Sequence, residues 1–266
     1  MHIIVCIKQV PDATSVDIDP KTGNLIREGA DFKINHYDLH ALEAALLLKE
    51  QNGATVTALS MGPPQAAQAV KEALMLGADH GVLISDRAFA GADVLATSYT
   101  LSQAISTLPA YDLIICGKQT TDGDTAQVGP SLAEFLSIAH VSWVSDVLSI
   151  AADKITARQD LNEIFQDVRL EFPCLITVEK KKSSPRLPSY LRKKQFAQTE
   201  IPILTISDLP DQDPAKYGGN GSPTRVEKIF PPTINTDRFL FKESPEQAAA
   251  YLYDYLVAKK FIKEDA

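Results

Sequence analysis

Residues 116–133 read Cys-Gly-Lys-Gln-Thr-Thr-Asp-Gly-Asp-Thr-Ala-Gln-Val-Gly-Pro-Ser-Leu-Ala. An apolar run at 113–116 ends where the polar loop begins, and apolar residues at helical spacing resume at Val128, which predicts a buried strand leading into a helix. The first N–H groups of a helix lack backbone partners and carry partial positive charge, so they attract phosphate. Two interpretations stay open: a phosphate-binding loop, or an ordinary turn in which Asp122 or Asp124 caps the helix.

The chain before this loop repeats the same strand–helix rhythm. The pattern predicts strands at 2–7, 55–60, 81–84 and 113–116, helices at 37–51, 65–76, 93–108 and 125–137, and a hairpin at 15–26. Strands that alternate with helices favour an α/β fold, with a mainly parallel, doubly wound sheet covered on both faces. Ligands of such sheets bind beyond the carboxyl ends of the strands, where the quoted loop lies.

The pattern changes after residue 140. Four short β-like runs, at 142–150, 155–159, 164–170 and 174–178, predict an antiparallel extension of the same sheet. Pro, Ser, Gly and charged residues then dominate, and a structureless segment of that length is unusual within one domain. We therefore predict three parts: a nucleotide-binding domain at 1–182, an extended partner-docking arm at 183–243, and a C-terminal helix at 244–266 that docks on a partner subunit.

Composition excludes several classes of protein. The net charge of −8 argues against a nucleic-acid binder, and no apolar run is long enough to cross a bilayer. The three cysteines, Cys6, Cys116 and Cys174, lie in apolar runs and are typical of a reducing compartment. The chain enters a strand at once, without a secretory signal, so we expect a cytoplasmic protein without membrane insertion.

The sequence offers no catalytic machinery of its own. It has no Gly-x-Gly-x-x-Gly after a strand, no Walker motif, no Gly-x-Ser-x-Gly elbow and no nucleophile–base pair. His36 and His40 have metal-ligand spacing but no third ligand nearby, so no metal site is expected. Any chemistry would then be carried by a bound cofactor.

Several motifs, in order along essentially the whole chain, resemble the electron transfer flavoprotein β subunit. They are Val5-Cys-Ile-Lys-Gln-Val-Pro-Asp12, Ile34-Asn35, Ser60-Met-Gly-Pro63, Ala73-Leu-Met-Leu-Gly-Ala-Asp79, Gly117-Lys-Gln119 followed by Asp122-Gly-Asp-Thr-Ala-Gln127, and Pro185-Arg-Leu-Pro188. The resemblance implies a nucleotide-binding domain similar to the adenine-nucleotide α-hydrolases, paired with an FAD-carrying α subunit.

The resemblance also implies residue roles. It implies cofactor contacts at Cys6, Asn35, Met61, Thr97, Asp122, Gly123, Asp124, Thr125, Ala126, Gln127, Val128 and Gly129. It implies that Pro185, Arg186 and Leu191 belong to a loop that docks partner dehydrogenases. No catalytic residue is implied.

The family divides by what fills the site, and the loop is where its members differ. Simple carriers hold AMP and carry a more crowded, carboxylate-rich loop, whereas members that bifurcate or confurcate electrons hold FAD and bind NAD beside it. Gly123 in place of a carboxylate resembles the second kind. That kind exchanges electrons between NAD, ferredoxin and a flavin dehydrogenase of acyl-CoA or hydroxy-acid type, through the α-subunit FAD.

Three alternatives stay open. The first is the AMP-holding carrier subunit. The second is an adenine-nucleotide hydrolase, although Lys8-Gln-Val-Pro11 differs from the Ser-Gly-Gly loop usual after the first strand of that class. The third is a nucleotide-sensing module, which would be stable without an α partner.

Overall fold

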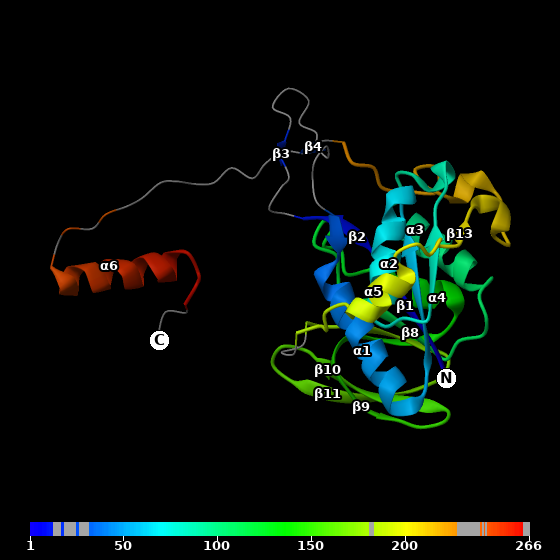
Figure 1. Ribbon diagram of the computed structural model, residues 1–266. Coiled ribbons are helices and arrows are strands. Elements are labelled where there is room, and N and C mark those ends of the chain that lie inside the picture. Colours follow the sequence, from blue (N-terminus) through cyan, green and yellow to red (C-terminus); the bar gives the residue numbers. More distant parts are fainter. Residues whose placement is uncertain are drawn as a thin grey trace. The chain divides into compact units, whose positions relative to one another are not determined.

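The computed structural model describes residues 1–12, 17–18, 25–26, 32–180, 184–227, 240, 242 and 244–262. The chain forms two compact units, Met1–Ile229 and Phe230–Ala266. The first unit contains the sheet and its covering helices (Figure 1).

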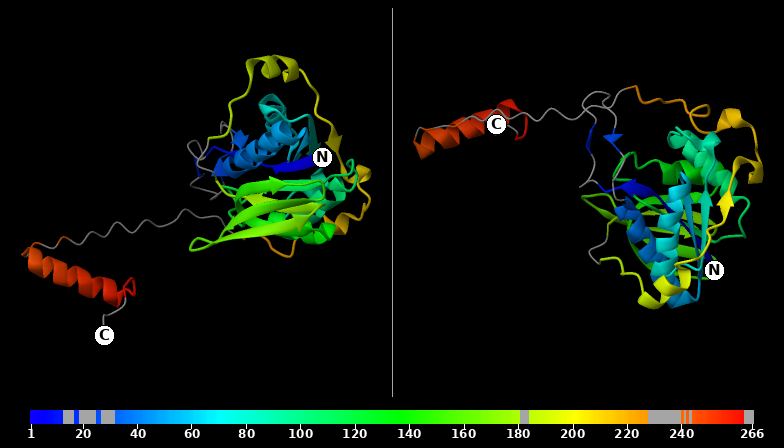
Figure 2. Two further views of the ribbon diagram at one scale, coloured as in Figure 1. Left: turned by 90° about the horizontal axis from the view of Figure 1, so that it is seen from below. Right: turned by 45° about the horizontal axis from the view of Figure 1, so that its top comes forward.

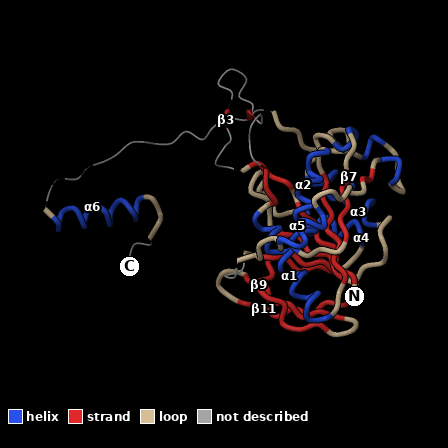
Figure 3. The backbone as a smooth tube through the Cα atoms, in the orientation of Figure 1, coloured by secondary structure: helices blue, strands red, loops and turns tan. Residues whose placement is uncertain are grey.

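Among the described residues, nine strands form the main sheet, in the order β11-β10-β9-β12-β8-β1-β6-β7-β13. Figure 3 draws the strands in red. Their bounds are β1 (His2–Ile7), β6 (Thr55–Met61), β7 (His80–Ile84), β8 (Leu113–Gly117), β9 (Ala139–Ile150), β10 (Lys154–Asp160), β11 (Phe165–Glu171), β12 (Cys174–Val178) and β13 (Ile203–Leu204). Two small antiparallel pairs stand apart: β2 (Gln9–Pro11) with β5 (Phe32–Ile34), and β3 (Asp17–Ile18) with β4 (Leu25–Ile26). The β3–β4 pair confirms the hairpin, whose turn lies outside the described residues.

Helices cover both faces of the sheet (Figure 2). The α-helices of the first unit are α1 (His36–Asn52), α2 (Ala67–Leu76), α3 (Val94–Ile105), α4 (Val128–Leu136) and α5 (Tyr190–Phe196), and the short 3₁₀ helices are η1 (Pro64–Ala66), η2 (Arg87–Phe89), η3 (Ile206–Asp208) and η4 (Pro214–Lys216). Helices α1 and α2 share one apolar core with the sheet, and α3 and α4 share the other. The predicted doubly wound α/β fold is confirmed.

Strand β1 lies at the point where the winding reverses. It pairs in parallel with β6 on one side and with β8 on the other. The chain runs through α1 and α2 in one direction, and α3 then carries it back across β1 to β8. The carboxyl ends of β1 and β8 therefore border the crevice where ligands of doubly wound sheets bind.

The antiparallel extension is confirmed for β9, β10 and β11, but the prediction for residues 174–178 was wrong in direction. Strand β12 inserts between β8 and β9 and runs parallel to both. All five of its residues are buried, which is typical of a central parallel strand covered on both faces. Its largely apolar run, Cys-Leu-Ile-Thr-Val, is the sequence pattern that indicates such a strand.

Residues 201–222 differ from the extended arm that composition predicts. Strand β13 adds to the sheet beside β7, and Leu209 and Tyr217 are buried in the α3–α4 core. Isolated apolar residues among prolines and glycines have no helical or strand period, so this packing was not apparent in the sequence.

The second unit contains α6 (Pro245–Ala258). Its start at Pro245 confirms the predicted helix, and Ser244 and Gln247 form a capping box there. None of its described side chains is buried within the unit.

Candidate functional site

Asp38 ties together the strand ends at the crevice. Its carboxylate accepts the backbone N–H of Lys8, just after β1, at 2.8 Å, and that of Gly117 at the end of β8. A Cβ on Gly117 would lie 2.3 Å from Asp38 Oδ1, so glycine is required for this close approach. Helix α1 is thereby fixed against both strands.

Burial raises the pKa of Asp38 to about 7, against the opposing effect of hydrogen bonds from Asn35 and from the amides of Lys8 and Gly117. A carboxyl group that titrates near neutral pH thus lies beneath the crevice. Perturbed carboxyls of this kind cluster at functional sites.

Asn35 holds the loop that follows β8. The side chain is fully buried; its Nδ2 donates to the Gln119 carbonyl at 2.8 Å and its Oδ1 accepts the Thr121 N–H at 3.2 Å. It precedes α1 without capping it. Asn35 therefore lies at the site, and its amide orients the loop.

The loop carboxylates have partners of their own. Lys8 Nζ contacts both oxygens of Asp122, at 2.6 and 2.9 Å, and Asp124 accepts a hydrogen bond from Gln119. Burial alone would raise the pKa of Asp122, but the Lys8 ammonium holds it below its ordinary value. Neither aspartate caps a helix, so the structure does not have the ordinary capped turn left open by the sequence.

Helix α4 begins at Val128, later than predicted, and its N-cap residue Gln127 makes no side-chain cap. By contrast, Asp93 caps α3 through the Ala96 N–H. Asp124 and Ala126 have left-handed backbone (φ 52° and 56°), and most side chains of 121–127 are exposed. An accessible, uncapped helix start with adjacent loop amides is suited to an anion.

The two glycines of this region serve different purposes. A Cβ on Gly123 would meet only Thr120 Oγ1, at 3.4 Å, so space is open around it. A Cβ on Gly129 would meet Thr177 Cγ2 at 2.5 Å, because α4 packs closely on β12. The lack of a side chain at Gly129 is thus explained by packing.

The remaining predicted contacts divide into two groups. Cys6 and Met61 lie near the carboxyl ends of β1 and β6, and Cys6 is in register with Cys116 across the β1–β8 pair. Thr97 lies in the first turn of α3, and α3 and α4 cover the same face of the sheet. The neighbouring Ser98 hydroxyl donates to the Val94 carbonyl at 2.7 Å and lies 3.4 Å from the Val128 carbonyl, which links α3 to α4.

Two cavities lie at opposite edges of the sheet. One of about 160 Å³ borders the crevice and is lined by Pro11, Lys33, Ile34, His36, Leu39 and Thr121. A larger one of about 400 Å³ includes Met1 and Asp112, at the amino ends of β1 and β8. Because parallel sheets bind ligands at their carboxyl ends, the crevice is the better candidate despite its smaller cavity.

Within the described ranges, no three His, Cys, Asp or Glu side chains gather as metal ligands. The same ranges contain no helix with the length and hydropathy needed to cross a bilayer.

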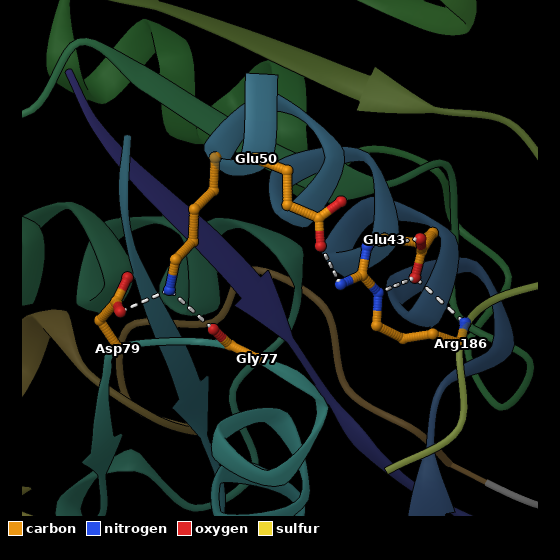
Figure 4. Close-up of polar contacts among 6 residues, drawn as sticks. Glu43, Glu50, Gly77, Asp79 and Arg186 are labelled. Carbon is orange, nitrogen blue, oxygen red and sulfur yellow. Dashed lines mark hydrogen bonds and ion pairs between the residues drawn. The ribbon is translucent and has the colours of Figure 1, made fainter. Parts of the chain in front are cut away.

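The residues predicted to dock a partner, Pro185, Arg186 and Leu191, lie in the segment before and within α5. Leu191 is 74% exposed, whereas Arg186 reaches back to Glu43 and Glu50 on α1 (Figure 4). Pro185 precedes that arginine. The segment presents Leu191 outward and Arg186 inward.

Sequence reasoning missed two site residues, Lys8 and Asp38. Lys8 belongs to the motif at residues 5–12, and its position directly after a buried strand could have indicated that it lies at the site. Asp38 lies in the first turn of α1, close to its apolar positions. An acidic residue there is usually explained by the favourable interaction of its charge with the helix dipole, so its position in the sequence did not indicate a place at the site.

These features define an α/β protein with a crevice at the carboxyl ends of its parallel strands. The electron transfer flavoprotein domain family matches residues 22–209. The chain is 43% identical over 262 residues to the electron transfer flavoprotein subunit beta of Clostridium acetobutylicum, covering 98% of this chain and all of that protein. It is 39% identical over 270 residues to Protein FixA of Azorhizobium caulinodans (99% and 95% covered). It is 42% identical over 264 residues to the caffeyl-CoA reductase-Etf complex subunit CarD of Acetobacterium woodii (98% and 100% covered).

The chain belongs to the electron transfer flavoprotein family, and within it to the β subunit type. Membership implies an α subunit as partner and association with a flavin or nucleotide.

Proposed function

We propose that this β subunit serves a bifurcating or confurcating electron transfer flavoprotein. It binds FAD in the crevice, with NAD(H) beside it, and exchanges electrons between NAD, ferredoxin and a flavin dehydrogenase through the α-subunit FAD. A bound FAD would supply the hydride and single-electron chemistry.

The observation that carries this proposal is the open loop at Gly123 beside the uncapped start of α4. Backbone amides at 125–128 would hold the cofactor's diphosphate, and small side chains leave room for it. At the same edge the Lys8 ammonium pairs with Asp122 and offsets the charge of that carboxylate. Asn35 fixes the loop, and Cys6, Met61 and Thr97 would line the remainder.

The dehydrogenase partner is proposed from the docking residues. Leu191 and its apolar neighbours are exposed, and the name of the Acetobacterium relative associates that protein with a caffeyl-CoA reductase. We therefore propose a flavin dehydrogenase of acyl-CoA or hydroxy-acid type as the partner. Helix α6, with Leu252 and Tyr255 exposed, would dock on the α subunit.

Nucleotide content tests the cofactor assignment. The heterodimer with its α subunit is purified, denatured, and its released nucleotides are separated and counted. Two FAD per heterodimer supports the proposal, and one FAD with one AMP replaces it by the simple carrier. Steady-state ATP hydrolysis by the purified protein would instead favour the hydrolase.

A single substitution sharpens the same test. Gly123→Asp adds a carboxylate where the backbone leaves room, so we expect it to lower retention of the β-subunit flavin by charge repulsion. Gly123→Ala is the matched control, because it adds bulk without charge. Equal flavin content in both variants would contradict a diphosphate at this loop.

A further inference from the structure

Arg186 is bound to the domain by an extensive set of hydrogen bonds. Its backbone N–H and its Nε donate to Glu43 Oε2 at 3.0 and 2.9 Å, and its Nη2 donates to Glu43 Oε1 at 2.9 Å. Its Nη1 donates to Glu50 Oε1 at 2.6 Å. Figure 4 shows the guanidinium between the two carboxylates of α1. The planar fork of arginine matches this bidentate geometry, which lysine cannot reproduce.

A second arginine fixes the other end of the segment. Arg192 donates from Nε to the Leu74 carbonyl at 2.8 Å and from Nη2 to the Ala78 carbonyl at 2.6 Å. Leu74 lies in the last turn of α2, where helix carbonyls lack partners and the dipole is negative, and Ala78 lies two residues beyond the end of the helix. The guanidinium also lies over the Phe196 ring, 5.0 Å from its centroid.

Apolar side chains between the two arginines point away from the domain. Leu187 is 88% exposed, Tyr190 72% and Leu191 74%, and no residue of α5 is buried. Lys193 and Lys194 add positive charge in the last turn of α5. An apolar surface with a basic border fits a partner whose apolar pocket has an acidic rim.

The carboxylates on α1 stay ionised at neutral pH. Burial alone would raise the pKa of Glu43, but hydrogen bonds and charge from Arg186 hold it below its ordinary value. The same guanidinium lowers the pKa of Glu50. The contact is therefore intact at the pH at which a partner would bind.

We infer that Arg186 is a positioning residue: it holds residues 184–196 against α1 so that Leu187, Tyr190 and Leu191 are presented in place to the flavin dehydrogenase. The inference rests on the proposed function, and it gives Arg186 the role of an internal anchor of the docking loop. A segment already ordered before binding loses less conformational freedom when the complex forms. Loss of the anchor should therefore weaken encounter with the partner and leave electron transfer within the bound complex unchanged.

The test uses the heterodimer with its α subunit. A flavin acyl-CoA dehydrogenase, supplied with its acyl-CoA substrate, reduces the heterodimer, and the heterodimer in turn reduces a dye whose colour is followed. Varying the heterodimer concentration gives KM and kcat separately. The variants are Arg186→Gln and the charge exchange Arg186→Glu with Glu43→Arg. Arg158→Gln is the matched control, because Arg158 makes a similar bidentate pair, with Asp167, on the β10–β11 hairpin. Hydrogen exchange of residues 184–196 reports order without depending on activity.

We expect Arg186→Gln to raise KM by about tenfold with kcat unchanged, since preorganisation acts on binding. Exchange within 184–196 should speed up, the charge-exchange pair should recover part of both effects, and Arg158→Gln should match the wild type. An unchanged KM or unchanged exchange in Arg186→Gln overturns the inference.

Leu191→Ala separates this inference from the proposed docking. If Leu191→Ala raises KM and Arg186→Gln does not, only the positioning role fails. If neither an acyl-CoA nor a hydroxy-acid flavin dehydrogenase reduces the wild-type heterodimer, the proposed partner fails, and the positioning role fails with it.

Discussion

Residues 184–200 and 201–222 are adjacent in the chain and similarly rich in polar residues, proline and charge, yet they fold in opposite ways. The first segment lies on the surface, attached by Arg186, Arg192 and the half-buried Phe196, with Leu187, Tyr190 and Leu191 outside. The second adds β13 to the sheet and buries Leu209 and Tyr217.

The difference lies in where the apolar side chains go. Burial of a large aromatic or leucine side chain contributes far more to stability than an exposed ion pair. The second segment should therefore unfold with the domain, whereas the first should loosen by itself. The first is suited to recognition, because its apolar surface is available.

The largest expected effect is at Tyr217. This side chain is fully buried, contacts the rings of Phe89 and Tyr99, and donates a hydrogen bond to the Asp211 carbonyl. Tyr217→Ala should lower the free energy of unfolding by about 3–5 kcal/mol in urea titrations. Tyr190→Ala, at an exposed tyrosine, should change it by less than about 0.5 kcal/mol. Similar losses in both variants would remove the distinction between the segments.

A matched leucine pair should give the next largest difference. Leu209 is 2% exposed, so Leu209→Ala should cost about 2–4 kcal/mol of folding free energy. Leu191→Ala should leave stability unchanged and impair reduction by the dehydrogenase. Thermal unfolding and the coupled dye assay measure the two effects, and a stability loss in Leu191→Ala would show that Leu191 packs on the domain.

A smaller, pH-dependent effect is expected at Asp211. Hydrogen bonds from Lys216 and Tyr99 hold the pKa of Asp211 below its ordinary value of 3.8. Its ionised form therefore stabilises the folded state above that pH, and the contribution is lost as pH falls below it. Asp211→Asn should lower Tm at pH 7, and the difference from wild type should shrink toward pH 3. Asp153→Asn, at an exposed carboxylate, is the control, and a difference that does not vary with pH would contradict this.

The smallest perturbation is brief proteolysis of the native protein. Lys193 and Lys194 lie in the surface segment, whereas Lys216 belongs to η4 in the packed one and pairs with Asp211 at 2.5 Å. Among these three lysines, trypsin should cleave after Lys193 or Lys194 first, since cleavage requires local opening. Mass spectrometry identifies the site. Early cleavage after Lys216 would indicate that 201–222 opens as readily as its neighbour.

The sequence predicted the parts of the fold that have a strong period. Buried strands such as 2–7 and 113–116, and helices with apolar positions at helical spacing such as 37–51, match the structure to within a residue or two. The direction of β12 was missed although its largely apolar run is typical of a buried parallel strand, and the packing of Tyr217 was missed because single apolar residues have no period.

The sequence indicated which stretch of chain forms the candidate site more accurately than it indicated what each residue of that stretch does. Asn35 does hold the loop that leads into 122–128, through Gln119 and Thr121, but Gly129 packs on β12. The function of a glycine depends on which atoms surround its missing Cβ, and those atoms belong to strands remote in sequence. For the same reason, the buried carboxyl of Asp38 is apparent only once β1 and β8 are placed.

The insertion of β12 between β8 and β9 has a consequence for synthesis on the ribosome. Until residues 174–178 have emerged from the exit tunnel, β8 has an open edge and the β9–β11 hairpins have no connection to the parallel strands. Open strand edges invite pairing with other chains. A nascent chain that stalls shortly before this strand is therefore expected to depend on a chaperone more than the complete chain does.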